Sequence, residues 1–210
     1  MSDSLSNTGL PVEEAIAELR DALASRRHSV LIAPPGAGKT TLVPLRLLHE
    51  NWVAGRKIVM LEPRRLAARA AAQRMAHMLG EKVGDTVGYQ TRDERKIGAN
   101  TRIEVLTEGI LTRRLQNDPT LDGTALVIFD EVHERNVPTD LGLAFLLDAI
   151  KTFSTDVKIL AMSATAQTQL FAHVLADDQG DAPIVTSEGR TFPVDIRYIP
   201  KQRDERLENS

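Results

Sequence analysis

The segment from Val30 to Thr41 carries the residue types best suited to binding phosphate. It reads V-L-I-A-P-P-G-A-G-K-T-T, a short apolar run, then a loop with two prolines and two glycines, then a Lys-Thr pair that opens a helix. Glycines let the backbone pass close to a phosphate so that N–H groups point at its oxygens, and a helix N-terminus favours the negative charge. Lysine adds a point charge for the β- and γ-phosphates, and the hydroxyl next to it suits Mg²⁺. We therefore predict a phosphate-binding loop made of Pro35, Gly36, Ala37, Gly38, Lys39, Thr40 and Thr41, with Lys39 active in catalysis and Thr40 on the metal.

The loop departs from the usual pattern at its start, where Ala33 stands in place of the first glycine. Pro34 and Pro35 also lack N–H groups. The donors are therefore expected to come from Gly36 through Thr40.

Two carboxylates follow a continuous apolar run, Ala125 to Phe129. Asp130 comes directly after this predicted buried strand, where a nucleotide-binding protein holds Mg²⁺ through a coordinating water. Glu131 is expected to project toward the γ-phosphate and to polarise an attacking water. Two acidic residues after a strand can also be a solvated helix cap, but the upstream loop favours the catalytic interpretation.

His133 and the segment S-A-T are further polar groups near strand ends. No second histidine lies at ligand spacing from His133, which argues against a zinc site. We expect His133 to be a hydrogen-bonding residue that senses the state of the nucleotide. Ser163 and Thr165 are expected to bond to the D-E-V-H turn and couple it to the rest of the domain, with a helix N-cap as the alternative.

The composition is typical of a soluble domain with a hydrophobic core. The chain has 210 residues, of which 42% are hydrophobic, and a formal charge of −3, so nucleic acid can be bound only by local patches. The absence of cysteine excludes disulfides, thiolate metal sites and cysteine nucleophiles. No signal peptide or membrane-spanning stretch is recognisable, and we expect a cytoplasmic protein.

Strand and helix patterns alternate, which predicts an α/β fold with a mostly parallel central sheet and helices on both faces. Strands are expected at 30–32, 57–61, 102–106, 125–129, 158–162, 184–185 and 194–199, with 83–89 extended. Helices are expected from about 10 to 26, at 42–48, 66–79, 110–115, 140–150 and 167–175. Residues 1–9 are expected to be flexible, 10–200 to form the domain, and 201–210 to be a linker stub. Right-handed crossovers should gather the phosphate loop, E-P-R-R, T-E-G, D-E-V-H and S-A-T on one rim.

The motifs G-A-G-K-T, L-E-P-R-R-L-A-A, T-E-G, D-E-V-H and S-A-T, in this order, resemble those of the first RecA-like domain of a superfamily 2 helicase of the DEAH/DExH type. The resemblance covers about residues 10–200 and implies a RecA-like P-loop NTPase domain. Val132 stands where the family name has Ala, which leaves the liganding residues unchanged. The resemblance also implies that Arg64, Arg65, Arg92, Thr107 and Gly109 hold a nucleic-acid backbone, and that Arg74 stacks on a base. A solvated side chain is the alternative for each arginine.

Family members carry a second RecA-like domain with an arginine finger, and no such motif occurs in this chain. The chain is therefore expected to be the ATP-binding half of an ATP-dependent nucleic-acid helicase, with RNA favoured and DNA open. It is expected to be monomeric, to bind ATP or another NTP with Mg²⁺, to hydrolyse slowly and not to unwind alone. A nucleotide-dependent switch that unwinds nothing and a DNA-directed translocase are the alternatives.

Overall fold

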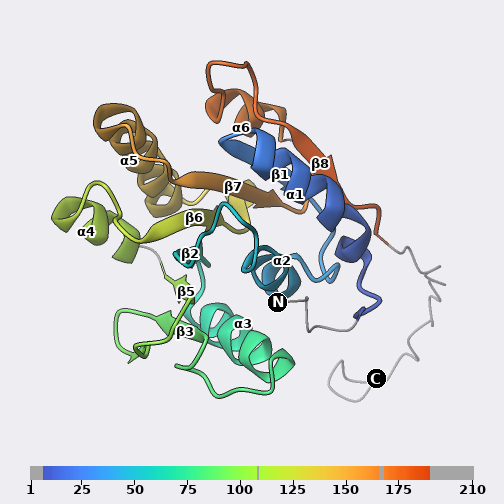
Figure 1. Cartoon of the computed structure of the whole chain (residues 1–210), viewed down its shortest axis with the longest axis vertical. Helices are drawn as coiled ribbons and strands as arrows, with labels where there is room; N and C mark the ends of the chain where they lie inside the picture. Colours follow the sequence, from blue (N-terminus) through green and yellow to red (C-terminus); the bar gives the residue numbers. More distant parts are fainter. Residues whose placement is uncertain (1–6, 108, 166–167, 190–210) are drawn as a thin grey trace, which may run out of the picture.

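A computed structural model describes residues 7–107, 109–165 and 168–189. It contains a single eight-stranded sheet (Figure 1). The strands are β1 (His28–Ile32), β2 (Lys57–Leu61), β3 (Val87–Gln90), β4 (Arg95–Lys96), β5 (Ile103–Leu106), β6 (Thr124–Phe129), β7 (Lys158–Ser163) and β8 (Ile184–Thr186). Their order in the sheet is β4-β3-β5-β2-β6-β7-β1-β8. Every neighbouring pair is parallel except β3 and β4, which are antiparallel.

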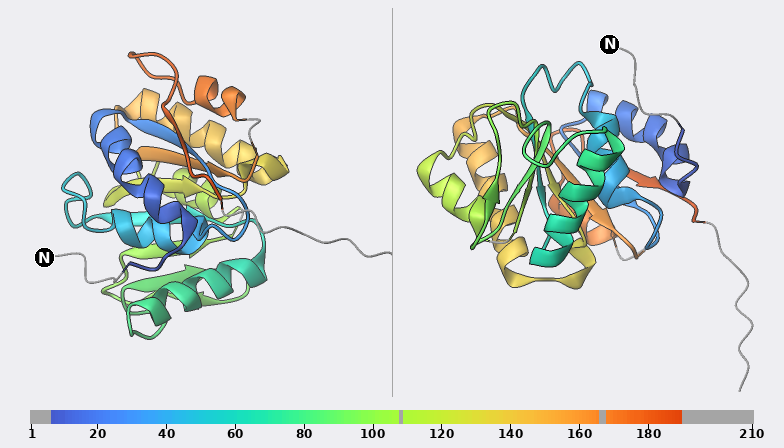
Figure 2. Two further views of the ribbon diagram at one scale, coloured as in Figure 1. Left: turned by 90° about the vertical axis from the view of Figure 1, so that its right-hand side faces the viewer. Right: turned by 90° about the horizontal axis from the view of Figure 1, so that it is seen from below.

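Helices cover both faces of the sheet (Figure 2). One face carries the 3-10 helix η1 (Pro11–Ala15) with α1 (Ile16–Ser25), α2 (Lys39–Leu47) and α3 (Arg65–Met78), and the other carries α4 (Ile110–Asn117), α5 (Val137–Phe153) and α6 (Gln169–Val174). Strand β2 shows why two cores form. Ile58 and Met60 belong to the first core, and Val59 and Leu61 belong to the second. Successive side chains of a strand point to opposite faces, so a fully apolar strand feeds both layers.

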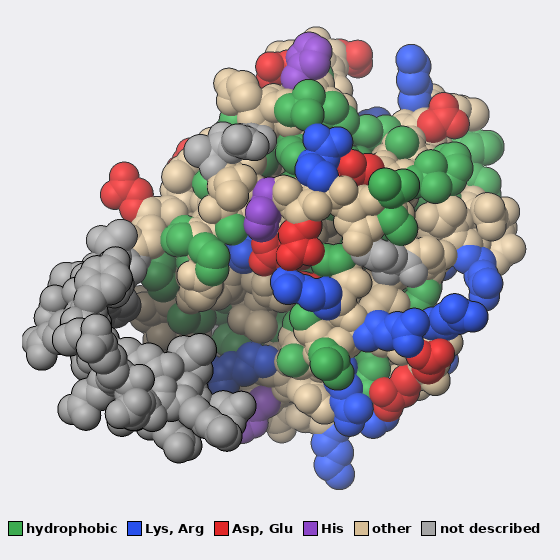
Figure 3. All heavy atoms as spheres, turned by 180° about the vertical axis from the view of Figure 1, so that it is seen from behind, with side chains coloured by type: hydrophobic (Ala, Val, Ile, Leu, Met, Phe, Trp, Pro, Cys, Tyr) green, Lys and Arg blue, Asp and Glu red, His purple; other side chains and the backbone are tan. Residues whose placement is uncertain are grey.

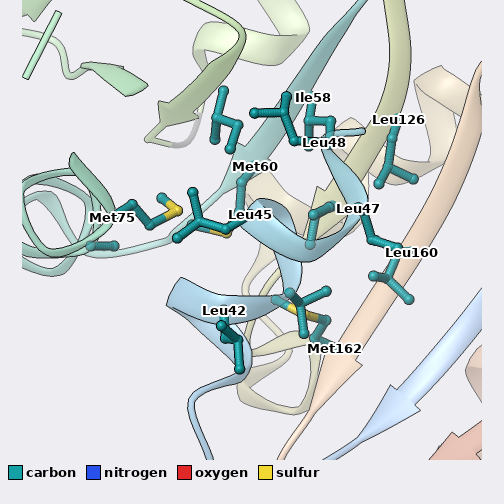
Figure 4. Packing of buried hydrophobic residues seen from close by; sticks show 14 of the residues in the cluster. Leu42, Leu45, Leu47, Leu48, Ile58, Met60, Met75, Leu126, Leu160 and Met162 are labelled. Atoms are coloured by element: carbon teal, nitrogen blue, oxygen red, sulfur yellow. The ribbon is translucent and has the colours of Figure 1, made fainter. Parts of the chain in front are cut away.

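Helix α2 is held in place by the first core (Figure 4). Its leucines Leu42, Leu45 and Leu47 are at most 2% exposed and pack in one cluster with side chains of β2, α3, β6 and β7. Each fully buried leucine contributes roughly 1.5–3 kcal/mol. Pro44 lies inside this helix. The phosphate loop is therefore followed by a helix whose position is fixed by burial.

The structure confirms the α/β class and most of the predicted elements. Helix α5 is longer than the predicted 140–150 because it begins at Val137 with Pro138 in its first turn, where a missing N–H costs nothing. The extended piece expected at 83–89 is the shorter strand β3, and β4 was not predicted. The strand expected at 194–199 and the stub at 201–210 lie outside the described residues.

Part of the segment predicted to be flexible is held by hydrogen bonds, since the Thr8 hydroxyl donates to the Glu13 carboxylate at 2.9 Å. Among the described residues, no helix has the length and apolar character needed to cross a membrane.

The motifs gather on one rim, as the topology predicts. The last residues of the strands lie in register, with Ile32 beside Ser163 and Leu61 beside both Phe129 and Leu106. Each motif follows directly on one of these strand ends. Because neighbouring strands are roughly 4.8 Å apart, the polar residues after them are within reach of one another.

Candidate nucleotide-binding site

The phosphate loop offers several free backbone donors. Gly36 and Gly38 have φ angles of 78° and 92°, which favour glycine, and Gly38 is the N-cap of α2. Within the part of the chain that the structure describes, the N–H groups of Gly36, Gly38, Lys39 and Thr40 donate no hydrogen bond. The Ala37 N–H, in contrast, donates to the Pro34 carbonyl at 3.2 Å, so the expectation that it is a free donor is corrected. The remaining donors form the kind of concave cradle that binds anions.

Lys39 and Thr40 face the two carboxylates that follow β6. The Lys39 ammonium lies 2.8 Å from Glu131 Oε1, and the Thr40 hydroxyl donates to Asp130 Oδ2 at 2.5 Å. Asp130 also accepts the N–H of Glu131 at 2.9 Å. Strand β7 lies between β6 and β1 in the sheet, so these contacts join residues about 90 positions apart in sequence across an intervening strand.

The burial of Asp130 sets its electrostatics. Burial raises the pKa of Asp130 to about 6, while the Thr40 hydroxyl and the charge of Lys39 act to lower it. A nearby cation stabilises the ionised form of a carboxylate in this environment. Hard oxygen atoms from a hydroxyl and a carboxylate are the ligands that Mg²⁺ prefers, so Thr40 and Asp130 fit the predicted metal role.

Two cavities lie beside the loop, with volumes of about 380 and 360 Å³. Thr40, Thr41, Arg74 and Glu131 line both. The first is also lined by Glu62, Arg64, Ala67, Ala70 and Ala71, and the second by Leu10, Pro35, Gly36, Gly38 and Lys39. Thus all predicted loop residues except Ala37, which is buried in the core, reach a cavity. The two spaces together form a concave site with Lys39 and Glu131 on its wall, and the buried Asp130 lies behind Thr40.

The turn after β6 has an unusual backbone. Glu131 and Arg135 have φ angles of 53° and 50°, and the short 3-10 helix η2 (Val132–Glu134) lies between them. Left-handed non-glycine residues are strained and cluster at functional sites. Here the conformation turns the Glu131 side chain toward Lys39.

His133 connects this turn to the segment after β7. Its Nδ1 accepts the Ala164 N–H at 3.3 Å and lies 3.3 Å from Glu131 Oε2. The predicted contact between the D-E-V-H turn and S-A-T therefore exists, but it is made by the backbone of Ala164. Ser163 and Thr165 bond to each other instead, with the Thr165 N–H donating to the Ser163 hydroxyl at 3.2 Å. Helix α6 begins later, with Thr168 as its N-cap, so neither residue caps it.

Glu62 belongs to the candidate site although its place in the E-P-R-R motif did not predict a role for it. It lines the first cavity, is 3% exposed and accepts the Arg64 N–H at 3.4 Å. Burial, followed by repulsion from Asp130, raises the pKa of Glu62 to about 7. The position of Glu62 directly after β2, which matches that of Asp130 after β6, is the sequence feature that could have predicted this location.

The predicted nucleic-acid residues occupy different places. Arg64 is exposed and pairs with Glu134 at 3.2 Å, Arg65 pairs with Asp93 at 2.5 Å, and Arg92 is exposed without a partner among the described residues. Thr107 is buried at the end of β5, with its N–H bonded to Gln90, and Gly109 is the exposed N-cap of α4. On the face seen in Figure 3, acidic side chains gather near the centre and Lys and Arg side chains lie around them.

Arg74 lies on α3 and lines both cavities next to the phosphate loop. Arg64 lines the first cavity, and Arg92 and Gly109 line neither. The predicted stacking of Arg74 on a base of a bound strand stays a prediction.

Three comparisons with known proteins identify the family to which the chain is similar. Residues 13–172 match the model of the DEAD/DEAH box helicase family. The chain is 49% identical to the ATP-dependent RNA helicase HrpB of Escherichia coli over 97% of this chain and 24% of the relative. It is 37% identical to the ATP-dependent RNA helicase DHX30 of Gallus gallus over 90% of this chain and 15% of the relative.

Solved structures show the same similarity. A crystal structure of the Escherichia coli DEAH/RHA helicase HrpB superposes with a TM-score of 0.83 at 49% identity, covering 95% of this chain and 25% of that chain. A second, of the DExH-box NTPase HrpB, superposes with a TM-score of 0.81 at 48% identity, covering 98% and 25%. This chain thus spans about a quarter of the length of these relatives. It has the RecA-like fold of their helicase domain, and it belongs to the DEAD/DEAH box helicase family.

Proposed function

We propose that this chain is the ATP-binding half of an ATP-dependent nucleic-acid helicase that couples NTP hydrolysis to movement along a single strand. The observation that carries the proposal is the convergence of Lys39 with Glu131, and of Thr40 with Asp130, beside the free N–H groups of the phosphate loop. The names of the similar proteins support RNA over DNA as the strand.

In this proposal, the loop N–H groups and Lys39 bind the phosphates, and Arg74 contacts the nucleotide from α3. Thr40 and Asp130 would hold Mg²⁺, which supplies charge neutralisation at the phosphate oxygens when bound. Glu131 orients and polarises the attacking water as a proton acceptor. Lys39 must exchange Glu131 for phosphate on binding, which frees the carboxylate for this role.

His133 would report the position of the Glu131 turn to the segment after β7 through its bond to Ala164. Arg64, Arg65, Arg92, Thr107 and Gly109 are proposed to contact the strand. Phosphate contacts of this kind do not depend on base sequence and weaken with salt, which suits a motor that moves along any strand.

A second RecA-like domain would complete the active site. An arginine from such a domain supplies much of the transition-state stabilisation in related NTPases. We therefore expect this chain alone to be a monomer that binds nucleotide, hydrolyses it slowly and does not unwind.

Nucleotide binding and turnover test the proposal. The dissociation constant of ATP with Mg²⁺ is measured for the wild type, for Lys39→Ala and for Lys151→Ala, an exposed lysine on α5 that serves as the matched control. We expect binding to be lost only in Lys39→Ala. If the wild type does not bind nucleotide, or if Lys39→Ala binds as the wild type does, the proposal is wrong.

Added single-stranded RNA or DNA then separates the alternatives. Little turnover on either polymer, with a nucleotide affinity that changes when polymer is present, supports an incomplete helicase half. A nucleotide affinity that no polymer changes would favour a switch that does not act on nucleic acid. A response to DNA alone would favour a DNA-directed translocase, and strong stimulation of turnover would show that a second domain is not needed.

A further inference from the structure

The residues that precede η1 lie against the phosphate loop. Leu10 lines the second cavity together with Gly38 and Arg74. A Cβ atom added to Gly38 would meet Leu10 Cδ1 at 2.6 Å, so the leucine side chain sits directly over this glycine. In the sequence, Leu10 is only the start of a predicted helical segment, because no residue next to it indicates a contact with Gly38.

A backbone hydrogen bond joins the same two segments. The Val12 N–H donates to the Ala37 carbonyl at 3.1 Å. In a planar trans peptide the C=O and the following N–H point in opposite directions. The bond from Val12 therefore turns the Gly38 N–H away from Val12, and this N–H is one of the free donors of the loop.

The segment is anchored firmly enough to impose this orientation. Val12 is fully buried in the first core. Glu13 forms an ion pair with Arg46 at 2.7 Å, and Arg46 belongs to α2, the helix that the phosphate loop opens. Thr8 donates to the same carboxylate of Glu13. The segment and the loop are thus tied to one helix.

We propose that Leu10 to Glu13, the N-terminal strap, positions the phosphate loop for nucleotide binding. Val12 sets the orientation of the Ala37–Gly38 peptide, and Leu10 covers Gly38 and keeps it in its left-handed conformation. Leu10 is thus a positioning residue, which acts on the phosphates through the loop. The proposal rests on the proposed function, because it concerns how the same site binds an NTP.

Leu10→Ala tests the strap. The dissociation constants of a fluorescent ADP analogue and of inorganic pyrophosphate are measured for the wild type, Leu10→Ala and Leu10→Met. We expect Leu10→Ala to weaken both ligands roughly fivefold or more, which corresponds to about 1 kcal/mol, and Leu10→Met to bind nearly as the wild type does. Leu141→Ala, which truncates a partly exposed leucine of α5, is the control and should change neither constant.

A double substitution tests the contact itself. Gly38→Ala is expected to weaken binding strongly, because it combines a φ of 92° with the clash against Leu10. Removing the leucine side chain in Gly38→Ala/Leu10→Ala should recover part of this loss, and such non-additivity reports a direct coupling. Strictly additive effects would overturn the proposal. The effect of Gly38→Ala in the Leu10→Ala background is measured between two variants that both carry Leu10→Ala. The comparison therefore remains informative if Leu10→Ala lowers the thermal stability.

The outcomes separate the two proposals. If the wild type binds neither ligand, the proposed function fails. If the wild type binds both and Leu10→Ala binds equally well, the strap alone fails. If Leu10→Ala weakens ADP but not pyrophosphate, Leu10 contacts the nucleoside and does not position the loop, which also overturns the inference.

Discussion

The ammonium of Lys39 and the carboxylate of Glu131 lie 2.8 Å apart, and their side chains are only 5% and 17% exposed. The cation proposed to bind phosphate is therefore paired with the carboxylate proposed to polarise water. Charge-assisted hydrogen bonds of this kind are roughly twice as strong as neutral ones. In the proposed function, a nucleotide competes with Glu131 for Lys39, and this competition would link phosphate binding to the release of the carboxylate proposed to polarise water.

Glu131→Gln should separate binding from turnover. The amide cannot accept a proton, so we expect the hydrolysis rate to fall by about 10²-fold or more. Nucleotide affinity should be kept or rise a few-fold, because the amide binds Lys39 more weakly than the carboxylate does. Steady-state phosphate release and titration with a fluorescent nucleotide measure the two quantities. Glu134→Gln, which changes an exposed glutamate of the same turn, is the control. If Glu131→Gln loses nucleotide affinity as much as it loses turnover, Glu131 does not compete with the nucleotide for Lys39.

The buried carboxyl of Glu62 makes the stability of the protein pH-dependent. Its folded pKa of about 7 lies above the reference value of 4.5, so between these values the native state binds more protons than the unfolded state. The buried Glu62 carboxyl therefore does not lower the free energy of unfolding below about pH 4.5. The free energy of unfolding falls as the pH rises from there through 7. Glu62→Gln removes the penalty and should stabilise the protein at pH 8 by on the order of 1–3 kcal/mol, with a smaller gain at pH 5.

Urea unfolding at pH 5 and pH 8, without Mg²⁺ or nucleotide, measures this difference. Glu134→Gln again serves as the exposed comparison. A gain in Glu62→Gln that is no larger at pH 8 than at pH 5 would show that Glu62 is ionised normally.

Arg92 offers the clearest test of strand binding. It is exposed and has no partner among the described residues, so its removal breaks no ion pair there. Arg92→Ala should weaken binding of single-stranded RNA independently of sequence and reduce the slope of log K against log salt by about 1. Arg27→Ala removes an exposed arginine just before β1, at the opposite edge of the sheet, and should leave the slope unchanged.

The bond between His133 and Ala164 predicts a local change in hydrogen exchange. His133→Ala removes the acceptor of the Ala164 N–H, and a typical hydrogen bond contributes about 1 kcal/mol. Exchange of this amide, followed by NMR, should therefore accelerate about fivefold. The Ile159 N–H donates to His28 Nδ1 at 3.1 Å and is an internal control in the same protein. Unchanged protection of Ala164 would remove the proposed link between the two turns.

Much of the fold and of the site follows from local pattern. The apolar runs at 58–61 and 125–129 are short, bounded by polar residues and buried on both faces, and strand β2 has the predicted bounds of 57–61. The loop with Gly36 and Gly38 needs positive φ angles, which the residue types themselves indicate. Alternation of strands and helices then places the motifs on one rim, since parallel strands joined by right-handed crossovers end at the same edge.

Only the tertiary structure decided which of these residues touch. The order β2-β6-β7-β1 sets Glu62 beside Asp130 and lets Thr40 reach across β7, and no local pattern specifies that order. The same holds for Leu10 over Gly38 and for Arg74 beside the phosphate loop. The sequence determined the chemical groups and the strand ends that carry them, because both depend on residue type and short spacing. The pairing of Lys39 with Glu131, the raised pKa of Glu62 and the strap on the loop depend on burial and long-range packing, which arise only when the layers assemble.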